Sequence, residues 1–199
     1  MTTTAARPTI LAVCTGNICR SPAVERLLQA AVGEGFEVRS AGTGALVGSP
    51  IDPPMARLLT DEGVDTTGFA SRQLTPDLVR GADLVLALTR EHRSAAVRMV
   101  PAALRKAFTL RELARLLSLA PHEDLPAEPA ERLAELLVRV RATRTQSGAR
   151  LPDVRAEDDD VVDPYRGDDA LFLESWRQLA PAVTTIAGAL TGSPAGTTH

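Results

Sequence analysis

The stretch from Val13 to Pro22, which reads Val-Cys-Thr-Gly-Asn-Ile-Cys-Arg-Ser-Pro, constrains the fold more than any other part of this chain. It follows a continuous apolar run, Thr9 to Val13, of the kind that forms a parallel strand buried on both faces. It precedes a segment whose apolar residues recur at helical spacing, namely Val24, Leu27, Leu28 and Ala31. The order strand, loop, helix predicts the beginning of a βαβ unit.

The loop in this stretch has the features of an oxyanion site. We expect the helix to begin with Ser21 as N-cap and Pro22 at the first helical position, so that the loop meets the positive end of the helix. Five residues separate Cys14 from Arg20. A loop of this length can curl its backbone amides around a tetrahedral anion, while the planar guanidinium of Arg20 grips two of its oxygens. The loop therefore predicts binding of a phosphate-like group.

A cysteine in this setting is a candidate nucleophile. A helix N-terminus and a neighbouring cation stabilise a thiolate at Cys14, and the hydroxyl of Ser21 is placed to donate to that sulfur. Attack by Cys14 on a phosphoester gives a thiophosphate intermediate and leaves a group that needs a proton. Asp163, in a turn-forming Asp-Pro-Tyr, is the candidate general acid, and we expect it to be buried near Tyr165.

Further strands and helices alternate along the chain. The sequence predicts strands at 36–41, 82–88 and 106–109, and helices that end near Glu62 and Gly81 or span 89–100 and 110–119. The second strand should lie beside the first and end in the glycine-rich turn Gly42–Gly44. This alternation predicts an α/β fold, a doubly wound, four-stranded parallel sheet with helices on both faces. Ligands bind such sheets at the carboxyl ends of the strands, where the Cys14 loop falls.

The character of the sequence changes between about 120 and 157. A helix is predicted around 131–141, and we interpret this region as a helical insertion packed on the body, before the segment that carries Asp163. The acidic run from Glu157 to Asp160 is interpreted as a solvated face. A last amphipathic helix is predicted over 169–190. We expect a single domain over residues 1–199, with its core at about 9–190 and flexible termini at 1–8 and 191–199.

Composition narrows the classes of function. The 199 residues are 44% hydrophobic with a net charge of −3, which offers no overall attraction to nucleic acid. No apolar run approaches the ~20 residues of a membrane span and no targeting segment is evident, so we expect no membrane partner and a cytoplasmic location. The two cysteines, Cys14 and Cys19, do not have the spacing of a zinc site or a disulfide framework. We therefore expect neither a metal nor a cofactor, and interpret His92 and His122 as surface residues.

The motifs resemble those of the low-molecular-weight protein tyrosine phosphatases. The family signature is Cys-x5-Arg-Ser near the N-terminus and Asp-Pro-Tyr near the C-terminus, and both are present, in that order, at Cys14–Ser21 and Asp163–Tyr165. Ser40–Thr43 is similar to the strand-end segment of the family. The resemblance covers Thr9 to about Leu117 and Asp160 to Leu190. It implies a flavodoxin-like fold and a protein-tyrosine-phosphatase whose substrate is a phosphotyrosine-containing protein or a small phosphoester.

The resemblance also implies roles for individual residues. Cys14 is the nucleophile, Arg20 the phosphate clamp, and Asp163 the acid and then the base. The remaining loop residues bind phosphate or support the loop: Thr15, Gly16, Asn17, Ile18, Cys19 and Ser21. Within this set Asn17 braces the loop and Ser21 tunes Cys14. By the same resemblance, Cys19 can form a reversible disulfide with Cys14 under oxidation.

The chain departs from the family pattern around the expected substrate pocket. Ala45-Leu46-Val47 replaces an aromatic wall, and Arg166 stands where a second aromatic often follows the Asp-Pro-Tyr motif. Aromatic stacking on a phosphotyrosine ring is then weaker, and Tyr165 remains as the aromatic wall. We expect the pocket rim to consist of Leu46, Val47, Tyr165 and Arg166.

Three other functions are compatible with such a loop. An arsenate reductase would have to use an external thiol, because this chain has no cysteine pair outside the loop to resolve the intermediate. Protein-arginine phosphatases of the same family usually have threonine where Ile18 stands, so Ile18 favours tyrosine. A non-catalytic oxyanion-binding regulatory protein would need neither Cys14 nor Asp163, and the presence of both argues against it.

Overall fold

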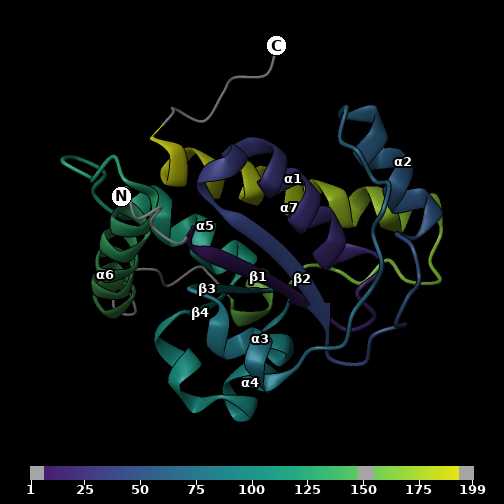
Figure 1. Cartoon of the computed structure of the whole chain (residues 1–199), viewed down its shortest axis with the longest axis horizontal. Coiled ribbons are helices and arrows are strands. Elements are labelled where there is room, and N and C mark those ends of the chain that lie inside the picture. Colours follow the sequence, from purple (N-terminus) through teal and green to yellow (C-terminus); the bar gives the residue numbers. More distant parts are fainter. Residues whose placement is uncertain (1–6, 148–154, 193–199) are drawn as a thin grey trace, which may run out of the picture.

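A four-stranded parallel sheet forms the centre of the molecule in the computed structural model, which describes residues 7–147 and 155–192 (Figure 1). Its strands are β1 (Thr9–Cys14), β2 (Glu37–Gly42), β3 (Leu84–Ala87) and β4 (Ala107–Thr109), in the order β2-β1-β3-β4. All three pairings are parallel, and β2 lies beside β1. The predicted sheet is confirmed, whereas the predicted flexible termini lie largely outside the described residues.

Helices cover both faces of this sheet. The seven α-helices among the described residues are α1 (Arg20–Val32), α2 (Pro53–Asp61), α3 (Pro76–Gly81), α4 (Arg90–Met99), α5 (Leu110–Leu119), α6 (Pro129–Ser147) and α7 (Asp169–Thr191). Short 3-10 helices occur at Gly33–Gly35, Pro101–Arg105 and Ala156–Asp159. Helices α1, α5 and α7 cover one face, and α3 and α4 cover the other (Figure 1).

The central strand shows why its sequence is a continuous apolar run. Ile10 and Ala12 point into the core shared with α1, α5 and α7, whereas Leu11 and Val13 point into the second core on the α3 and α4 side. All four side chains are at most 1% exposed. Because both faces are buried, neither set of alternating positions can be polar.

The start of α1 differs from the prediction. The helix begins at Arg20 with Cys19 in the N-cap position, so Ser21 and Pro22 lie inside its first turn. Ser21 does not cap the helix because its hydroxyl is used by the loop: it lies 2.9 Å from Cys14 Sγ and accepts a 2.9 Å hydrogen bond from Asn17 Nδ2. The loop nevertheless leads directly into a helix N-terminus, as expected.

The predicted helical insertion contains α6, which is longer at both ends than the sequence indicated. It packs against α5 and α7, with four buried apolar side chains, Leu133, Leu136, Leu137 and Val140. Two arginines of α6 add polar contacts: Arg144 Nη2 lies 2.7 Å from Glu112 Oε1, and Arg132 Nε donates to the Ala189 carbonyl at 2.7 Å. The helix is therefore part of the packed body.

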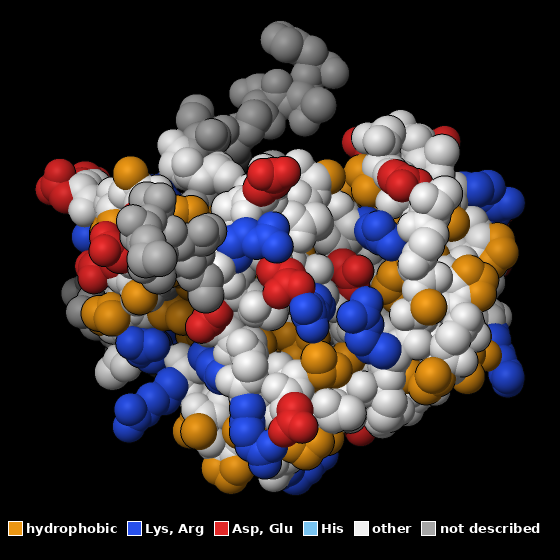
Figure 2. Space-filling model, viewed as in Figure 1, with side chains coloured by type: hydrophobic (Ala, Val, Ile, Leu, Met, Phe, Trp, Pro, Cys, Tyr) orange, Lys and Arg blue, Asp and Glu red, His pale blue; other side chains and the backbone are white. Residues whose placement is uncertain are grey.

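Charged side chains of both signs are interspersed on the face shown in Figure 2. Such a mixture does not produce the single-sign field that steers a polyanion. Among the described residues, no helix is long and apolar enough to cross a membrane.

Candidate active site

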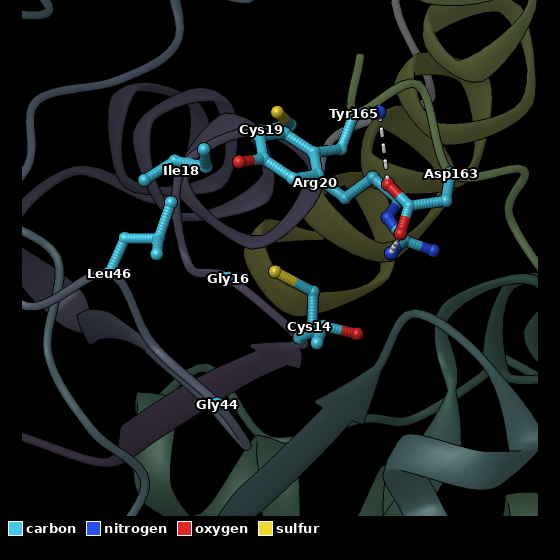
Figure 3. Close-up of a pocket in the computed structure, with 10 residues that line it drawn as sticks. Cys14, Gly16, Ile18, Cys19, Arg20, Gly44, Leu46, Asp163 and Tyr165 are labelled. Carbon is cyan, nitrogen blue, oxygen red and sulfur yellow. Dashed lines mark hydrogen bonds and ion pairs between the residues drawn. The ribbon is translucent and has the colours of Figure 1, made fainter. Parts of the chain in front are cut away.

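A pocket opens at the carboxyl end of β1, where the loop from Cys14 to Arg20 meets two other segments (Figure 3). The loop contributes Cys14, Thr15, Gly16, Ile18, Cys19 and Arg20 to its lining. The segment after β2 contributes Gly44 and Leu46, and the segment before α7 contributes Asp163 and Tyr165. The structure thus brings together the two sequence motifs that are farthest apart in the chain.

Cys14 is the last residue of β1, and its side chain is only 2% exposed. Its Sγ lies 2.9 Å from the hydroxyl of Ser21, which is fully buried beneath the loop. A hydroxyl that donates to sulfur stabilises its anionic form. The geometry therefore agrees with the expected pairing of these two residues.

The backbone of the loop is turned so that its carbonyls face away from the pocket. The carbonyls of Cys14, Thr15 and Gly16 accept hydrogen bonds of 2.9–3.0 Å from the amides of Thr43, Gly44 and Leu46. Among the hydrogen bonds of the described residues, the amides of residues 16–20 donate to no other part of the chain. Free consecutive amides of this kind form an anion-binding nest.

Asn17 holds this conformation from below. It is completely buried and has a positive φ of 54°, a region in which asparagine is tolerated better than most residues. Its Nδ2 donates to the hydroxyls of Ser21 and Ser40 at 2.9 and 2.8 Å, and its Oδ1 accepts from the amide of Arg72 at 2.8 Å. Every polar atom of the side chain thus fixes the loop, in the bracing role that the family resemblance implies.

Arg20 supplies the positive charge of the pocket. Its side chain is 3% exposed; Nη1 donates to the carbonyl of Val161 at 3.0 Å, and Nη2 lies 2.5 Å from Asp163 Oδ2. Its Nε is buried and has no hydrogen-bond partner. A buried guanidinium N–H without an acceptor is costly, and the amide nest beside it would hold an anion within its reach.

Asp163 reaches the pocket, but not in the buried setting predicted from the sequence. Its side chain, in the segment before α7, is 49% exposed. Oδ1 accepts a 3.2 Å hydrogen bond from the amide of Tyr165, and Oδ2 pairs with Arg20 (Figure 3). The carboxylate is consequently oriented toward the phosphate loop from the open side of the pocket.

Cys19 also lines the pocket, and both cysteines are free thiols. Burial raises the pKa of the Cys19 thiol well above its usual range, and the negative charges of Asp52 and Cys14 add to the effect. Cys19 is therefore a neutral thiol under ordinary conditions, unlike a thiol activated for attack. Its disulfide with Cys14 remains a prediction.

Two of the four residues predicted for the pocket rim line the pocket in the structure. Leu46 and Tyr165 line the pocket and are 44% and 43% exposed. Val47 is 70% exposed and Arg166 stacks its guanidinium on the Tyr165 ring, 5.1 Å from the centroid, so neither belongs to the lining. Ile18, which was predicted to bind phosphate or support the loop, also forms an apolar part of the pocket wall.

The prediction that His92 lies on the surface is wrong. It is 6% exposed, and its ring joins the hydroxyls of Thr15 and Thr89: Nε2 lies 2.9 Å from Thr15 Oγ1, and Nδ1 lies 2.9 Å from Thr89 Oγ1. Burial, together with the charge of Arg20, lowers the pKa of His92 to about 4. The histidine is therefore a neutral support of the phosphate loop, a role that a lone histidine in a sequence does not reveal.

The acidic run is only in part the solvated face that was predicted, because Glu157 and Asp158 are 60% and 38% exposed whereas the next two carboxylates form ion pairs with arginines of α4 and α5. Asp159 is 16% exposed and pairs with Arg115 at 2.8 Å, and Asp160 accepts hydrogen bonds from both the backbone and the side chain of Arg90. These pairs fasten the segment that leads to Asp163. No local pattern indicates them, because their arginine partners lie on α4 and α5.

Comparison with known proteins places these features in a family. The model of the low molecular weight phosphotyrosine protein phosphatases matches residues 9–142, more than half of the chain. The chain belongs to this family. Its match with the low molecular weight protein-tyrosine-phosphatase Etp of Escherichia coli K12 is 45% identical over 92 residues, which cover 46% of this chain and 62% of Etp. The chain thus spans less than two thirds of that relative.

The solved structures of two phosphatases share the fold. The tyrosine phosphatase Wzb from Escherichia coli K30, in complex with sulphate, has a TM-score of 0.64 at 26% identity and covers 92% of this chain and 97% of its own. The YwlE arginine phosphatase from Geobacillus stearothermophilus has a TM-score of 0.65, also at 26% identity, and covers 96% and 98%. The two likenesses are equal in strength, so they do not separate the two substrate classes.

Proposed function

We propose that this protein is a cysteine-dependent phosphomonoester hydrolase that acts on phosphotyrosine in proteins. The convergence of Cys14, Arg20 and Asp163 on one pocket carries the proposal. Cys14 Sγ attacks phosphorus while the bond to the ester oxygen breaks, and Asp163 gives its proton to the departing oxygen. Arg20 and the loop amides hold the equatorial oxygens of the transition state.

The second step returns the enzyme to its starting form. A water molecule attacks the phosphorus of the cysteinyl phosphate, Asp163 accepts a proton from it, and the sulfur leaves as a thiolate with release of inorganic phosphate. All of these steps use side chains of this chain alone. Two free thiols near the site suit the reducing cytoplasm, which we propose as its location.

The shape of the pocket favours an aryl phosphate. Cys14 lies at its floor and is nearly inaccessible, whereas Leu46 and Tyr165 stand at its mouth. A flat phenyl ring bridges this depth between the apolar walls of Ile18, Leu46 and Tyr165. A serine phosphate has a shorter stem and no ring to contact these walls.

The decisive experiment uses p-nitrophenyl phosphate. Cys14→Ser should abolish turnover while retaining the melting temperature and the affinity for inorganic phosphate, because the loop amides and Arg20 remain. Turnover by Cys14→Ser at the wild-type rate contradicts the mechanism. If a folded Cys14→Ser variant loses both turnover and phosphate binding, the assignment of phosphate binding to the loop amides and Arg20 is wrong.

The substrate class requires a separate comparison, because YwlE is described as an arginine phosphatase. We expect the purified protein to hydrolyse phosphotyrosine peptides faster than phosphoarginine or phosphoserine peptides of the same sequence. Ile18→Thr should reduce this preference, since the apolar wall that faces the ring becomes polar. A preference for phosphoarginine in the wild type would make the protein an arginine phosphatase instead.

A further inference from the structure

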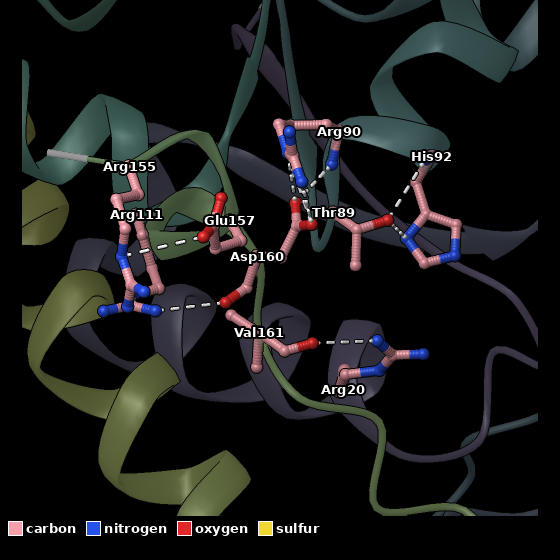
Figure 4. Close-up of polar contacts among 9 residues, drawn as sticks. All are labelled: Arg20, Thr89, Arg90, His92, Arg111, Arg155, Glu157, Asp160 and Val161. Atoms are coloured by element: carbon pink, nitrogen blue, oxygen red, sulfur yellow. Dashed lines mark hydrogen bonds and ion pairs between the residues drawn. The ribbon is translucent and has the colours of Figure 1, made fainter.

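The first turn of α4 contacts both the phosphate loop and the segment that leads to Asp163. Thr89 caps this helix, and the next residues carry two side chains that extend in different directions (Figure 4). Arg90 reaches the segment that leads to Asp163, and His92 reaches the phosphate loop at Thr15. Neither Arg90 nor His92 has a role in the proposed reaction itself.

On one side, Arg90 holds Asp160 by three donors. Its backbone amide donates to Asp160 Oδ1 at 2.7 Å, its Nη2 donates to Oδ2 at 3.1 Å, and its Nε lies 3.3 Å from both oxygens. A bidentate pair with an added helix amide fixes both the position and the orientation of a carboxylate. Arg111 Nη1 donates to the Asp160 carbonyl at 3.1 Å and strengthens the same attachment (Figure 4).

The fixed point lies close to the acid in sequence. Directly after Asp160, the amide of Val161 donates to the carbonyl of Leu88 at 2.8 Å, and the carbonyl of Val161 accepts from Arg20 Nη1. Asp163 follows two residues later. The attachment of Asp160 therefore determines where the general acid stands relative to the pocket.

On the other side, His92 fixes the residue after the nucleophile. Its ring spans from Thr89, at the N-cap of α4, to Thr15, which lines the pocket. The ring is buried and its pKa is lowered, so it stays neutral near pH 7 and makes both hydrogen bonds. The distance from helix to loop is thus set by one rigid side chain.

We propose, on the basis of the proposed function, that Arg90 and His92 are positioning residues. Through the first turn of α4, they align the segment that carries Asp163 with the phosphate loop, residues 14–20. Arg90 acts through Asp160 on proton transfer. His92 acts through Thr15 on binding of the phosphoryl group. Substitutions at the two positions should therefore change different kinetic quantities.

The test measures kcat/KM for aryl phosphates whose leaving groups range from 2,4-dinitrophenol to phenol. In Arg90→Gln, kcat/KM should fall at least about tenfold for phenyl phosphate but less than about twofold for the dinitrophenyl ester, since a poor leaving group needs the proton most. Tungstate should bind no more weakly than to the wild type, because Arg20 and the loop amides are unchanged and a displaced Asp163 carboxylate competes less for Arg20. In His92→Gln, tungstate should bind about 3- to 10-fold more weakly, with the leaving-group dependence of the wild type.

Two further measurements complete the test. Arg80→Gln breaks an exposed pair with Asp77, 2.7 Å long, within α3, and it should change neither quantity. Amide hydrogen exchange at Val161 should accelerate in Arg90→Gln but not in Arg80→Gln. The alignment is wrong if Arg90→Gln keeps both the wild-type leaving-group dependence and the wild-type exchange rate. If the wild type hydrolyses no aryl phosphate, the proposed function fails. Unchanged Val161 exchange in Arg90→Gln, together with unchanged tungstate affinity in His92→Gln, would then reject the alignment separately.

Discussion

Arg20 Nη2 and Asp163 Oδ2 form a 2.5 Å ion pair across the pocket, between a guanidinium that is nearly buried and a carboxylate that is half-exposed. In the proposed mechanism, Arg20 binds the oxygens of the phosphoryl group and Asp163 protonates its leaving group. An entering dianion therefore competes with the Asp163 carboxylate for one end of Arg20, and the acid form of Asp163 removes that competition. Pairing and protonation of Asp163 are in this way linked to oxyanion binding.

Asp163→Asn separates binding from turnover. The substitution removes the negative charge beside Arg20, so phosphate and tungstate should bind about 2- to 10-fold more tightly, a modest gain because the carboxylate is half-exposed. Hydrolysis of phenyl phosphate should fall about 10²- to 10⁴-fold with the loss of the general acid. Calorimetric titration with tungstate and steady-state kinetics measure the two effects. Weaker oxyanion binding by Asp163→Asn contradicts the competition.

Gly42→Ala tests how closely the strand-end turn approaches the phosphate loop. A Cβ at Gly42 would lie 2.3 Å from the Thr15 carbonyl oxygen, a backbone atom that also accepts from the Gly44 amide. The loop must shift, and we expect a loss of about 1–3 kcal/mol in stability together with weaker phosphate binding. Gly44→Ala is the matched control for stability, because its Cβ would meet only Thr15 Cγ2 at 4.0 Å. Equal melting temperatures for the two variants would contradict the steric argument.

The sequence allowed prediction of the sheet and of the chemistry at its edge. The apolar runs at β1 and β3 predicted buried parallel strands, since a short run without polar alternation is typical of a strand covered on both faces. The spacing from Cys14 to Arg20 predicted an anion loop because five residues are enough to turn the amides inward. Both inferences rest on short-range geometry, which a linear sequence contains.

What the sequence did not predict depends on partners that are far away along the chain. Ser21 was expected to cap α1, but Asn17 and Cys14 occupy its hydroxyl. His92 has no neighbouring signal that distinguishes it from a surface histidine, and only folding brings Thr15 to its ring. Likewise, Asp160 becomes an anchor only because α4 presents Arg90 to it. Such roles follow from tertiary contacts and have no periodic pattern.

His92 should make stability fall at mildly acidic pH. Its pKa is about 4 in the folded protein, below the value of about 6.5 in an unfolded chain, so between these values the unfolded state binds the extra proton. Stability is therefore lost as pH falls from about 6.5 to 4, by at most about 3 kcal/mol from this residue. Urea unfolding at pH 7, 6, 5 and 4 measures the loss. His92→Gln should show a smaller decrease over this interval, and an identical decrease would exclude His92 as its source.

The buried face of α6 should contribute to the stability of the whole molecule. Leu136 is 2% exposed in the core between α6, α5 and α7, so Leu136→Ala leaves a cavity and should cost about 2–5 kcal/mol. Val138, on the same helix, is 51% exposed, and Val138→Ala should change stability by less than about 0.5 kcal/mol. Denaturant unfolding followed by circular dichroism compares the two variants. A single transition at lower urea in Leu136→Ala is expected because α6 shares one apolar core with β3, α5 and α7. An early, separate loss of helix signal would instead mean that α6 unfolds independently of the sheet.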